Sequence, residues 1–268
     1  MVGMSRQNYY RQRLVRREWT ADERLVLDLV RQERSRQPRL GGRKLLYLVR
    51  PEFDHAQVRL GRDRFFALLR RHDLLILRRR RGVRTTNSRH GFAIYPNTAK
   101  DMKLTGSHQL LVSDVTYIRT MDGFMYVALV TDAYSRKIVG YDSSESLGVE
   151  GALRALNMAL KQMPAGSRGT HHSDRGIQYC CRPYIERLQK AGLRISMTEE
   201  NHCYENSLAE RANGILKQEY GLGETFRTKT EVPSAVKEAV HLYNRHRPHT
   251  ALGYKTPEHI HGLNDAAA

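Results

Sequence analysis

The chain has 268 residues, 40% of them apolar, which is enough to bury a hydrophobic core and excludes wholesale disorder. Three cysteines without a CxxC pair exclude a disulfide framework and a structural zinc site, and they favour a reducing cytoplasm. The formal net charge of +17 predicts a polyanionic partner, and no apolar run is long enough to predict a membrane span.

The positive charge is concentrated in the first part of the chain. Residues 1–100 hold 25 Lys and Arg against 9 Asp and Glu, a net charge of +16. Residues 101–268 hold 20 against 19, a net charge of +1. We therefore expect a basic nucleic-acid-binding module followed by a nearly neutral one, against the alternative of a merely soluble, highly charged surface. The opening residues "MVGMSRQNYY" lack the apolar region of a signal peptide.

Short helices are predicted for the basic module. A capping box with Thr20 as the cap and Glu23 reaching back predicts that a helix begins there. Residues 41–50 and 61–72 predict two more helices, since apolar residues recur at helical spacing among basic ones. Such a series suits a helix-turn-helix-like module, although many small helical domains share the pattern.

A basic stretch, "RRRRGVRTTNSRHG" (78–91), follows the predicted helices. It has no apolar periodicity and contains four consecutive arginines. It is expected to be a linker that follows DNA phosphates, and a solvated run of charges is the alternative.

Residues 109–144 differ in composition from the preceding part of the chain and predict three β-strands. The segments 109–120, 124–135 and 137–144 are rich in β-branched and aromatic residues, and turn residues separate them. Helices are then predicted at 148–163, 182–193 and 206–221, and strands at 170–174 and 194–199. A meander followed by alternating helices and strands predicts an α/β fold: a mixed five-stranded sheet with helices on both faces.

Three carboxylates stand where this layout can bring them together. Asp114 lies in the first strand, Asp174 at the end of the fourth, and Glu210 on the helix after the fifth. Acids without basic partners repel one another when partly buried, and a divalent metal removes that cost. Two Mg²⁺ ions held by carboxylates can activate the attacking oxygen and stabilise the leaving oxygen of a phosphoryl transfer.

Helical geometry gives Glu210 two possible roles. Asn206, Glu210, Asn213 and Lys217 share one face of the predicted helix, so Lys217 could hold a phosphate beside a metal on Glu210. Alternatively, Ser207 and Glu210 form a capping box that only starts the helix.

These motifs resemble a known family. The segments "LLVSDVTYI", "HHSDRGIQY" and "ENSLAERANGILKQE", with 35 residues between Asp174 and Glu210, resemble the D, D(35)E core of insertion-sequence transposases and retroviral integrases. The tail "YNRHRPHTALGYKTP" (243–257) is similar to the second-reading-frame product of the insertion-sequence-three group. The resemblance covers roughly residues 40–258. The family usually has Trp where Leu111 stands here, which implies altered packing rather than lost activity.

The resemblance implies a ribonuclease-H-like catalytic core at 106–225, after a module at 1–77 and a linker at 78–105, with a C-terminal helix and tail at 226–268. It implies that Asp114, Asp174 and Glu210 are catalytic and bind two Mg²⁺ ions, for which Mn²⁺ can substitute. It makes Lys217 a contact for element-end DNA. Further DNA contacts are expected at basic residues of the module, linker and tail: Arg43, Lys44, Arg78, Arg79, Arg80, Arg81 and Arg247.

The resemblance further implies an enzyme of DNA transposition. A phosphodiester at the element's end would be hydrolysed, and the freed 3′-OH would attack a second one. Expected partners are element-end and target DNA, further copies of the chain, and an upstream-frame product, in the cytoplasm at the nucleoid and without a membrane. The alternative is a non-catalytic DNA-binding protein or repressor derived from a decayed transposase.

Other residues could be mistaken for site residues. His171 and His172 precede Asp174, but a structural role or a DNA contact is favoured, because imidazole suits Zn²⁺ better than Mg²⁺. Asp132 is expected to end the second strand, and Cys180 and Cys181 to be packing residues. A compact motif in the tail either contacts DNA or a neighbouring subunit, or only pins the tail: Tyr243, Arg247, Pro248 and His249.

Overall fold

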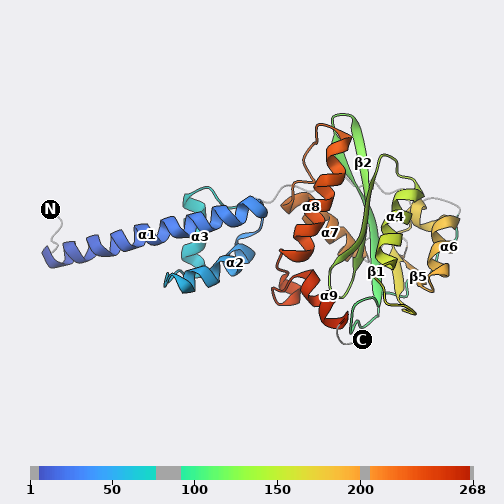
Figure 1. The fold of residues 1–268 in the computed structure, drawn as a ribbon, viewed down its shortest axis with the longest axis horizontal. Helices are drawn as coiled ribbons and strands as arrows, with labels where there is room; N and C mark the ends of the chain where they lie inside the picture. Colours follow the sequence, from blue (N-terminus) through green and yellow to red (C-terminus); the bar gives the residue numbers. More distant parts are fainter. Residues whose placement is uncertain (1–5, 77–91, 200–205, 266–268) are drawn as a thin grey trace. The chain divides into compact units, whose positions relative to one another are not determined.

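The computed structural model describes residues 6–76, 92–199 and 206–265, with backbone alone at 11–21 and 264–265 (Figure 1). The chain divides into two compact units, residues 1–79 and 80–268. Residues 77–91, which include all the arginines of the predicted linker, lie outside the described part. Within the described part, no helix is both long and apolar enough to cross a membrane.

The N-terminal unit consists of helices α1 (Arg6–Arg36), α2 (Gly42–His55) and α3 (Arg62–Arg71). The expectation that a helix begins at Thr20 is wrong, because α1 passes through that position without a break. Residues 6–19 are mostly good helix formers, so a capping pattern inside them does not interrupt the helix. The helix ends just before Gln37-Pro38, where the residue preceding proline disfavours helical geometry.

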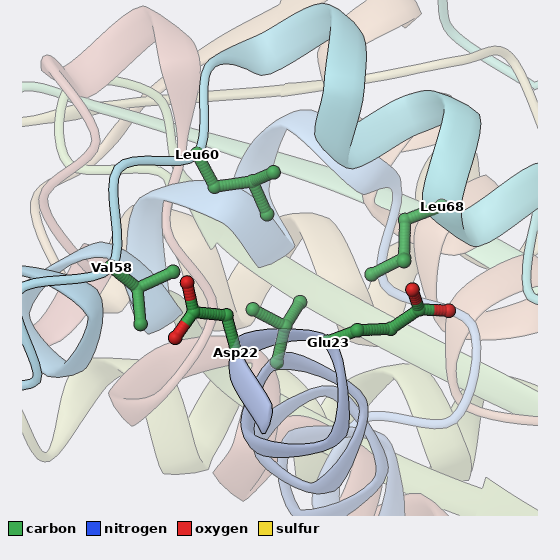
Figure 2. A pocket seen from close by; sticks show the side chains of 6 residues that line it. Asp22, Glu23, Val58, Leu60 and Leu68 are labelled. Carbon is green, nitrogen blue, oxygen red and sulfur yellow. The ribbon is translucent and has the colours of Figure 1, made fainter. Parts of the chain in front are cut away.

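Apolar side chains from the three helices form one core in this unit. Figure 2 shows a small hollow beside it, too small for a water-sized molecule, where α1 faces Val58, Leu60 and Leu68. Glu23 forms an ion pair there with Arg71 and a hydrogen bond with His72, whose Nε2 lies 2.8 Å from the carboxylate. The hydrogen bond from His72 lowers the pKa of Glu23, and Arg71 adds to this against the effect of burial. The core residues include Val26, Val30, Leu40, Leu45, Val49, Phe53, Phe65 and Leu69.

The second unit is built on a five-stranded sheet in the order β3-β2-β1-β4-β5. Its strands are β1 (Leu110–Thr120), β2 (Gly123–Asp132), β3 (Ile138–Ser144), β4 (Thr170–Ser173) and β5 (Arg194–Met197). The first three strands pair antiparallel, whereas β4 pairs parallel to both β1 and β5. The predicted mixed sheet is therefore confirmed.

Helices cover both faces of the sheet, as predicted (Figure 1). Side chains alternate along β2: Val127 and Leu129 pack toward α7 (Ser207–Glu219) and α8 (Val232–Arg245), while Ala128 and Val130 pack toward α4 (Val149–Leu160) and α6 (Arg182–Lys190). The sequence analysis did not predict α5 (Ile177–Cys180), a single turn between β4 and α6.

The C-terminal segment packs on this unit through α8 and α9 (Pro257–Asp265), with short 3₁₀ turns at Lys229–Glu231 and Thr250–Leu252. Asp132 is fully buried where β2 ends, and its Oδ1 accepts a hydrogen bond of 2.8 Å from Ser135 Oγ. The same hydroxyl lies 2.9 Å from Nδ1 of His261 on α9. Asp132 is thus a strand-end residue, as expected, and it also helps to fix the C-terminal helix.

Candidate functional site

Two aspartates meet where β1 and β4 lie side by side. Ser113 of β1 pairs with Ser173 of β4, and the next residue on each strand is an aspartate, Asp114 or Asp174. Because the two strands are parallel, both carboxylates lie at the same end of the paired region. The backbone N–H of Gly176 donates a hydrogen bond of 3.0 Å to Asp174 Oδ1, which orients that carboxylate at the start of the turn into α5.

Helix α7 contacts β1 through two buried asparagines on either side of Glu210. Asn206 donates from Nδ2 to the Ser113 carbonyl oxygen at 2.9 Å, and Asn213 donates from Nδ2 to Asp114 Oδ2 at 2.8 Å. Glu210 lies between these anchors in the first turn of the helix and is exposed. The helix therefore brings Glu210 to the end of the sheet that carries the two aspartates.

The three carboxylates lie close enough to act on one another electrostatically. Burial raises the pKa of Asp114 to about 7, with further raising effects from Asp174 and Glu210, against the hydrogen bond from Asn213. Burial also raises the pKa of Asp174, and Glu210 adds to it. These acids repel one another without a cation between them, which is the condition that the sequence predicted for a metal site.

The carboxylates do not form a closed ligand set in this structure. Across residues 6–76, 92–199 and 206–265, no group of three or more His, Cys, Asp or Glu side chains is arranged to hold a metal ion. The donor chemistry nevertheless suits Mg²⁺, which prefers carboxylate oxygens and keeps several of its waters. Glu210 is the exposed member of the three, so its side chain has the freedom to turn toward the aspartates.

The alternative role of Glu210 in a capping box is wrong. Ser207 is already the first residue of α7, so it does not occupy the capping position. That position belongs to Asn206, which makes no capping hydrogen bond from its side chain among the described residues and instead binds β1. The helix start consequently leaves the Glu210 carboxylate available.

Lys217 lies two turns after Glu210 and contacts an aromatic ring of β1. Its Nζ lies 4.5 Å from the centre of the Tyr117 ring. Burial lowers the pKa of Lys217, Asp114 raises it, and Arg119 lowers it. Lys217 is therefore a cation that lies beside Asp114 and near Tyr117 and Arg119 of β1.

The other predicted DNA contacts fall in different environments. Arg43 is exposed and Lys44 half-buried on α2, whereas the arginines of the linker at 78–81 lie outside the described residues. Arg247 is 2% exposed, and its guanidinium donates two hydrogen bonds of 2.8 Å to the Glu219 carboxylate. A DNA contact by Arg247 does not fit this position, because its donors already face a carboxylate at the end of α7.

The tail motif around Arg247 is buried as a unit. Tyr243 and His249 are buried and pack their rings edge to face at 4.9 Å between centroids. Of the two roles left open by the sequence, this geometry favours pinning the C-terminal segment to the core.

The two histidines before Asp174 are buried structural residues. His171 Nε2 lies 2.8 Å from Ser113 Oγ and 3.0 Å from Tyr184 Oη. Burial, with a contribution from His172, lowers the pKa of His171 to about 3, so this imidazole is neutral. His172 Nδ1 lies 2.9 Å from Ser196 Oγ. Both rings thus join neighbouring strands behind the aspartates.

Cys180 and Cys181 are packing residues, one buried and the other half-buried. Cys180 is buried, with Sγ 3.7 Å from Met197 Sδ, and Cys181 immediately precedes α6. Cys203 lies outside the described residues. Leu111, where the family usually has Trp, is fully buried in the core beneath α4.

Sequence analysis did not recognise the roles of Asn206, Asn213 and Tyr117. The sequence did contain a sign of the asparagines' roles. Both share the polar face of the helix with Glu210, and an uncharged amide can be buried against another element more easily than a charged group. Tyr117 had no signal of its own, since an aromatic residue in a strand is ordinarily a packing residue.

Comparisons with known proteins agree with this geometry. Residues 105–203 match the model of an integrase core domain, and residues 191–257 match a second model with the same description. The chain is 34% identical over 262 residues to the insertion element IS600 uncharacterized 31 kDa protein of Shigella sonnei, covering 96% of this chain and 94% of that protein. It is 33% identical over 197 residues to transposase InsF for insertion sequence IS3A of Escherichia coli (strain K12), covering 69% and 68%.

The chain belongs to the family of insertion-sequence transposases. It is accordingly an enzyme of DNA transposition and integration, a polynucleotidyl transferase with an integrase core. Among solved structures, a simian T-cell lymphotropic virus intasome in complex with PP2A regulatory subunit B56 gamma has a chain that matches at a TM-score of 0.51 and 16% identity, covering 75% of this chain and 67% of that one. That likeness concerns the fold alone, and it agrees with the predicted ribonuclease-H-like core of this transposase.

Proposed function

We propose that Asp114, Asp174 and Glu210 are the catalytic acids of this transposase and that they hold two Mg²⁺ ions, for which Mn²⁺ can substitute. The observation that carries the proposal is that β1, the end of β4 and the start of α7 bring three carboxylates to one end of the sheet. In addition to burial, Glu210 raises the pKa values of both aspartates there. When bound, the ions would supply the positive charge that activates an attacking oxygen and stabilises a leaving one. Strand cleavage at the element's end and transfer of the freed 3′-OH are the reactions that this chemistry serves.

The protein's own groups prepare the site for that chemistry. Asn213 holds the Asp114 carboxylate, and the Gly176 N–H holds that of Asp174. Glu210 is exposed and would turn toward the two aspartates when the site is filled. Lys217 would hold a DNA phosphate beside them, because its ammonium group is close enough to Asp114 for that carboxylate to raise its pKa.

DNA is the proposed partner of the basic residues outside the catalytic centre. The helical module at residues 1–77 and the linker at 78–105 would hold element-end or target DNA, with Arg43 exposed for a phosphate contact. Several copies of the chain would assemble on DNA, because two ends must be joined. An upstream-frame product and a nucleoid location belong to the same proposal.

Strand cleavage of a duplex that carries the element's end, compared between wild type and Asp174→Asn, tests the catalytic assignment. The wild type should nick the duplex only with Mg²⁺ or Mn²⁺, and the variant should bind the duplex with unchanged affinity but lose nicking. Equal nicking by both proteins would reject the assignment. Binding by the wild type without nicking in either metal would favour the non-catalytic DNA-binding alternative.

A further inference from the structure

An aromatic surface extends along β1 and β2 from the carboxylates. Strand β4 pairs with β1 only from Leu110 to Ser113, and farther along that side Phe226 forms an isolated parallel bridge with Thr120. Between these two pairings, the part of β1 from Asp114 to Ile118 has no backbone partner on that side among the described residues. Tyr117 lies in this part, half-buried, and packs edge to face against Phe124 of β2 at 5.5 Å between ring centroids. Phe124 is 47% exposed, which leaves an aromatic side chain open to solvent opposite Arg119, on the same strand as Asp114.

Two cations border these rings. Lys217 Nζ lies 4.5 Å from the centre of the Tyr117 ring, and Arg119 is near enough to lower the pKa of Lys217 by repulsion. Neither side chain forms an ion pair with another residue in the described part of the chain. Among the described residues, the acid that raises the pKa of Lys217 is Asp114, which the proposed function assigns to the metal ions. Two like charges held together in this way favour an anionic ligand between them.

Exposed aromatic rings bordered by cations are the arrangement with which proteins bind single-stranded DNA. Bases stack on the rings whatever their sequence, while the cations hold the phosphates on either side. A base can reach such a ring only when it is not stacked within a duplex.

We propose that Phe124, supported edge to face by Tyr117, is a stacking platform for an unpaired base of the DNA end, with Lys217 and Arg119 holding the adjacent phosphates. The inference rests on the proposed function, since it takes Asp114 as the place of cutting. It adds that the transposase prefers DNA ends whose last bases are frayed or single-stranded. The charge of the surface favours DNA over a protein partner, because both bordering side chains are cationic.

A binding experiment without catalysis tests the platform. The full chain is titrated, in EDTA, onto a duplex with a single-stranded tail that carries 2-aminopurine and onto the same duplex with a blunt end. Stacking should quench the 2-aminopurine fluorescence. Phe124→Ala should lose the quenching and weaken binding to the tailed duplex by about tenfold, with a change of less than about twofold for the blunt duplex.

Two further variants distinguish stacking from a general apolar contact. Phe124→Tyr keeps an aromatic ring and should retain both the quenching and the affinity. Met121→Ala removes a side chain that is 76% exposed at the same hairpin but has no ring, and it should behave as the wild type. Thermal unfolding of each variant checks that the fold is intact.

Equal weakening of tailed and blunt duplexes by Phe124→Ala, or an unchanged affinity for both, would overturn the proposal. So would a loss of self-association by Phe124→Ala with unchanged quenching, because it would assign the surface to a second copy of the chain. The result does not depend on metal or on cleavage. Failure of the Asp174→Asn comparison would therefore reject the catalytic assignment without deciding the stacking result.

Discussion

Asn213 of α7 donates a hydrogen bond of 2.8 Å to Asp114 of β1, and this contact joins the helix that carries Glu210 to the strand that carries the first aspartate. Asn213 is 5% exposed, and its Oδ1 is buried without a hydrogen-bond partner among the described residues. The amide nitrogen thus donates to a carboxylate, and the amide oxygen is an unused acceptor beside the proposed metal site. Asn213 orients the Asp114 carboxylate, so we regard it as a positioning residue.

Replacing Asn213 by Ala should raise the metal requirement. Without the amide, the ionised form of Asp114 loses a hydrogen bond that lowers its pKa, so protons compete better with Mg²⁺. We expect the Mg²⁺ concentration for half-maximal strand cleavage at pH 7 to rise about tenfold, the effect of one hydrogen bond to a charged group.

The difference in half-maximal Mg²⁺ concentration between Asn213→Ala and the wild type should become smaller above the pKa of Asp114, because the carboxylate is then ionised in both proteins. Gln218→Ala, on an exposed position of the same helix, is the matched control and should leave the metal titration unchanged. A gap that stays constant from pH 6 to pH 9 would indicate a general loss of structure rather than of positioning.

Asp114 should also make the metal-free protein less stable as pH rises. Its folded pKa of about 7 lies above the ordinary value of 3.8, so between those pH values the folded state holds a proton that the unfolded state has released. Stability from this group is therefore present at low pH and declines as pH rises toward 7. Asp114→Asn removes that decline while it keeps an oxygen that can accept from Asn213.

Denaturant unfolding in EDTA at pH 5 and pH 8 measures this effect. The stability of Asp114→Asn relative to the wild type should increase between the two pH values, and added Mg²⁺ should stabilise the wild type at pH 8 more than the variant. A difference between the proteins that does not change with pH would contradict the raised pKa.

Lys217→Ala should weaken binding to end-containing DNA and lower the salt slope by about one unit, because one phosphate contact is lost. The slope is measured as the change in the logarithm of the affinity with the logarithm of salt concentration. Gln218→Ala again serves as the control, with the slope of the wild type. An unchanged slope for Lys217→Ala would mean that the side chain does not touch a phosphate.

Arg247 should stabilise the fold rather than bind DNA. Its side chain is 2% exposed beside a Glu219 side chain that is 16% exposed, so Arg247→Ala leaves a largely buried carboxylate without its partner. We expect a loss of about 3 kcal/mol in the free energy of unfolding. The exposed pair Arg182 and Glu186 is the control, and Arg182→Ala should leave the free energy of unfolding close to that of the wild type.

Denaturant unfolding gives these energies, and DNA affinity is compared at a temperature where Arg247→Ala remains folded. An affinity that falls in the variant while its stability stays near that of the wild type would restore Arg247 as a DNA contact. Recovery of stability in the double variant Arg247→Leu with Glu219→Leu would support a role in the fold.

The fold of the second unit followed largely from local patterns. The β-branched and aromatic segments became strands within a few residues of their predicted bounds, because a strand buried on both faces needs such residues. The capping patterns at Thr20 and at Ser207 misled, since a short polar pattern fits a helix interior as well as a helix start. The predicted cap at Ser207 failed because Asn206 precedes the helix and its side chain donates a hydrogen bond to Ser113 of β1.

The sequence by itself determined which residues are the candidates for the chemistry: three acids in order, with 35 residues between the last two, and a basic first part. The tertiary structure alone decided which neighbours act on them. Asn213 meets Asp114 across 99 positions, Arg247 meets Glu219 across 28, and Lys217 lies over Tyr117. Spacing along a helix or strand fixes the face on which a side chain lies. Which partner it meets depends on how the helices pack against the sheet, because burial and hydrogen bonding are settled between elements far apart in the chain.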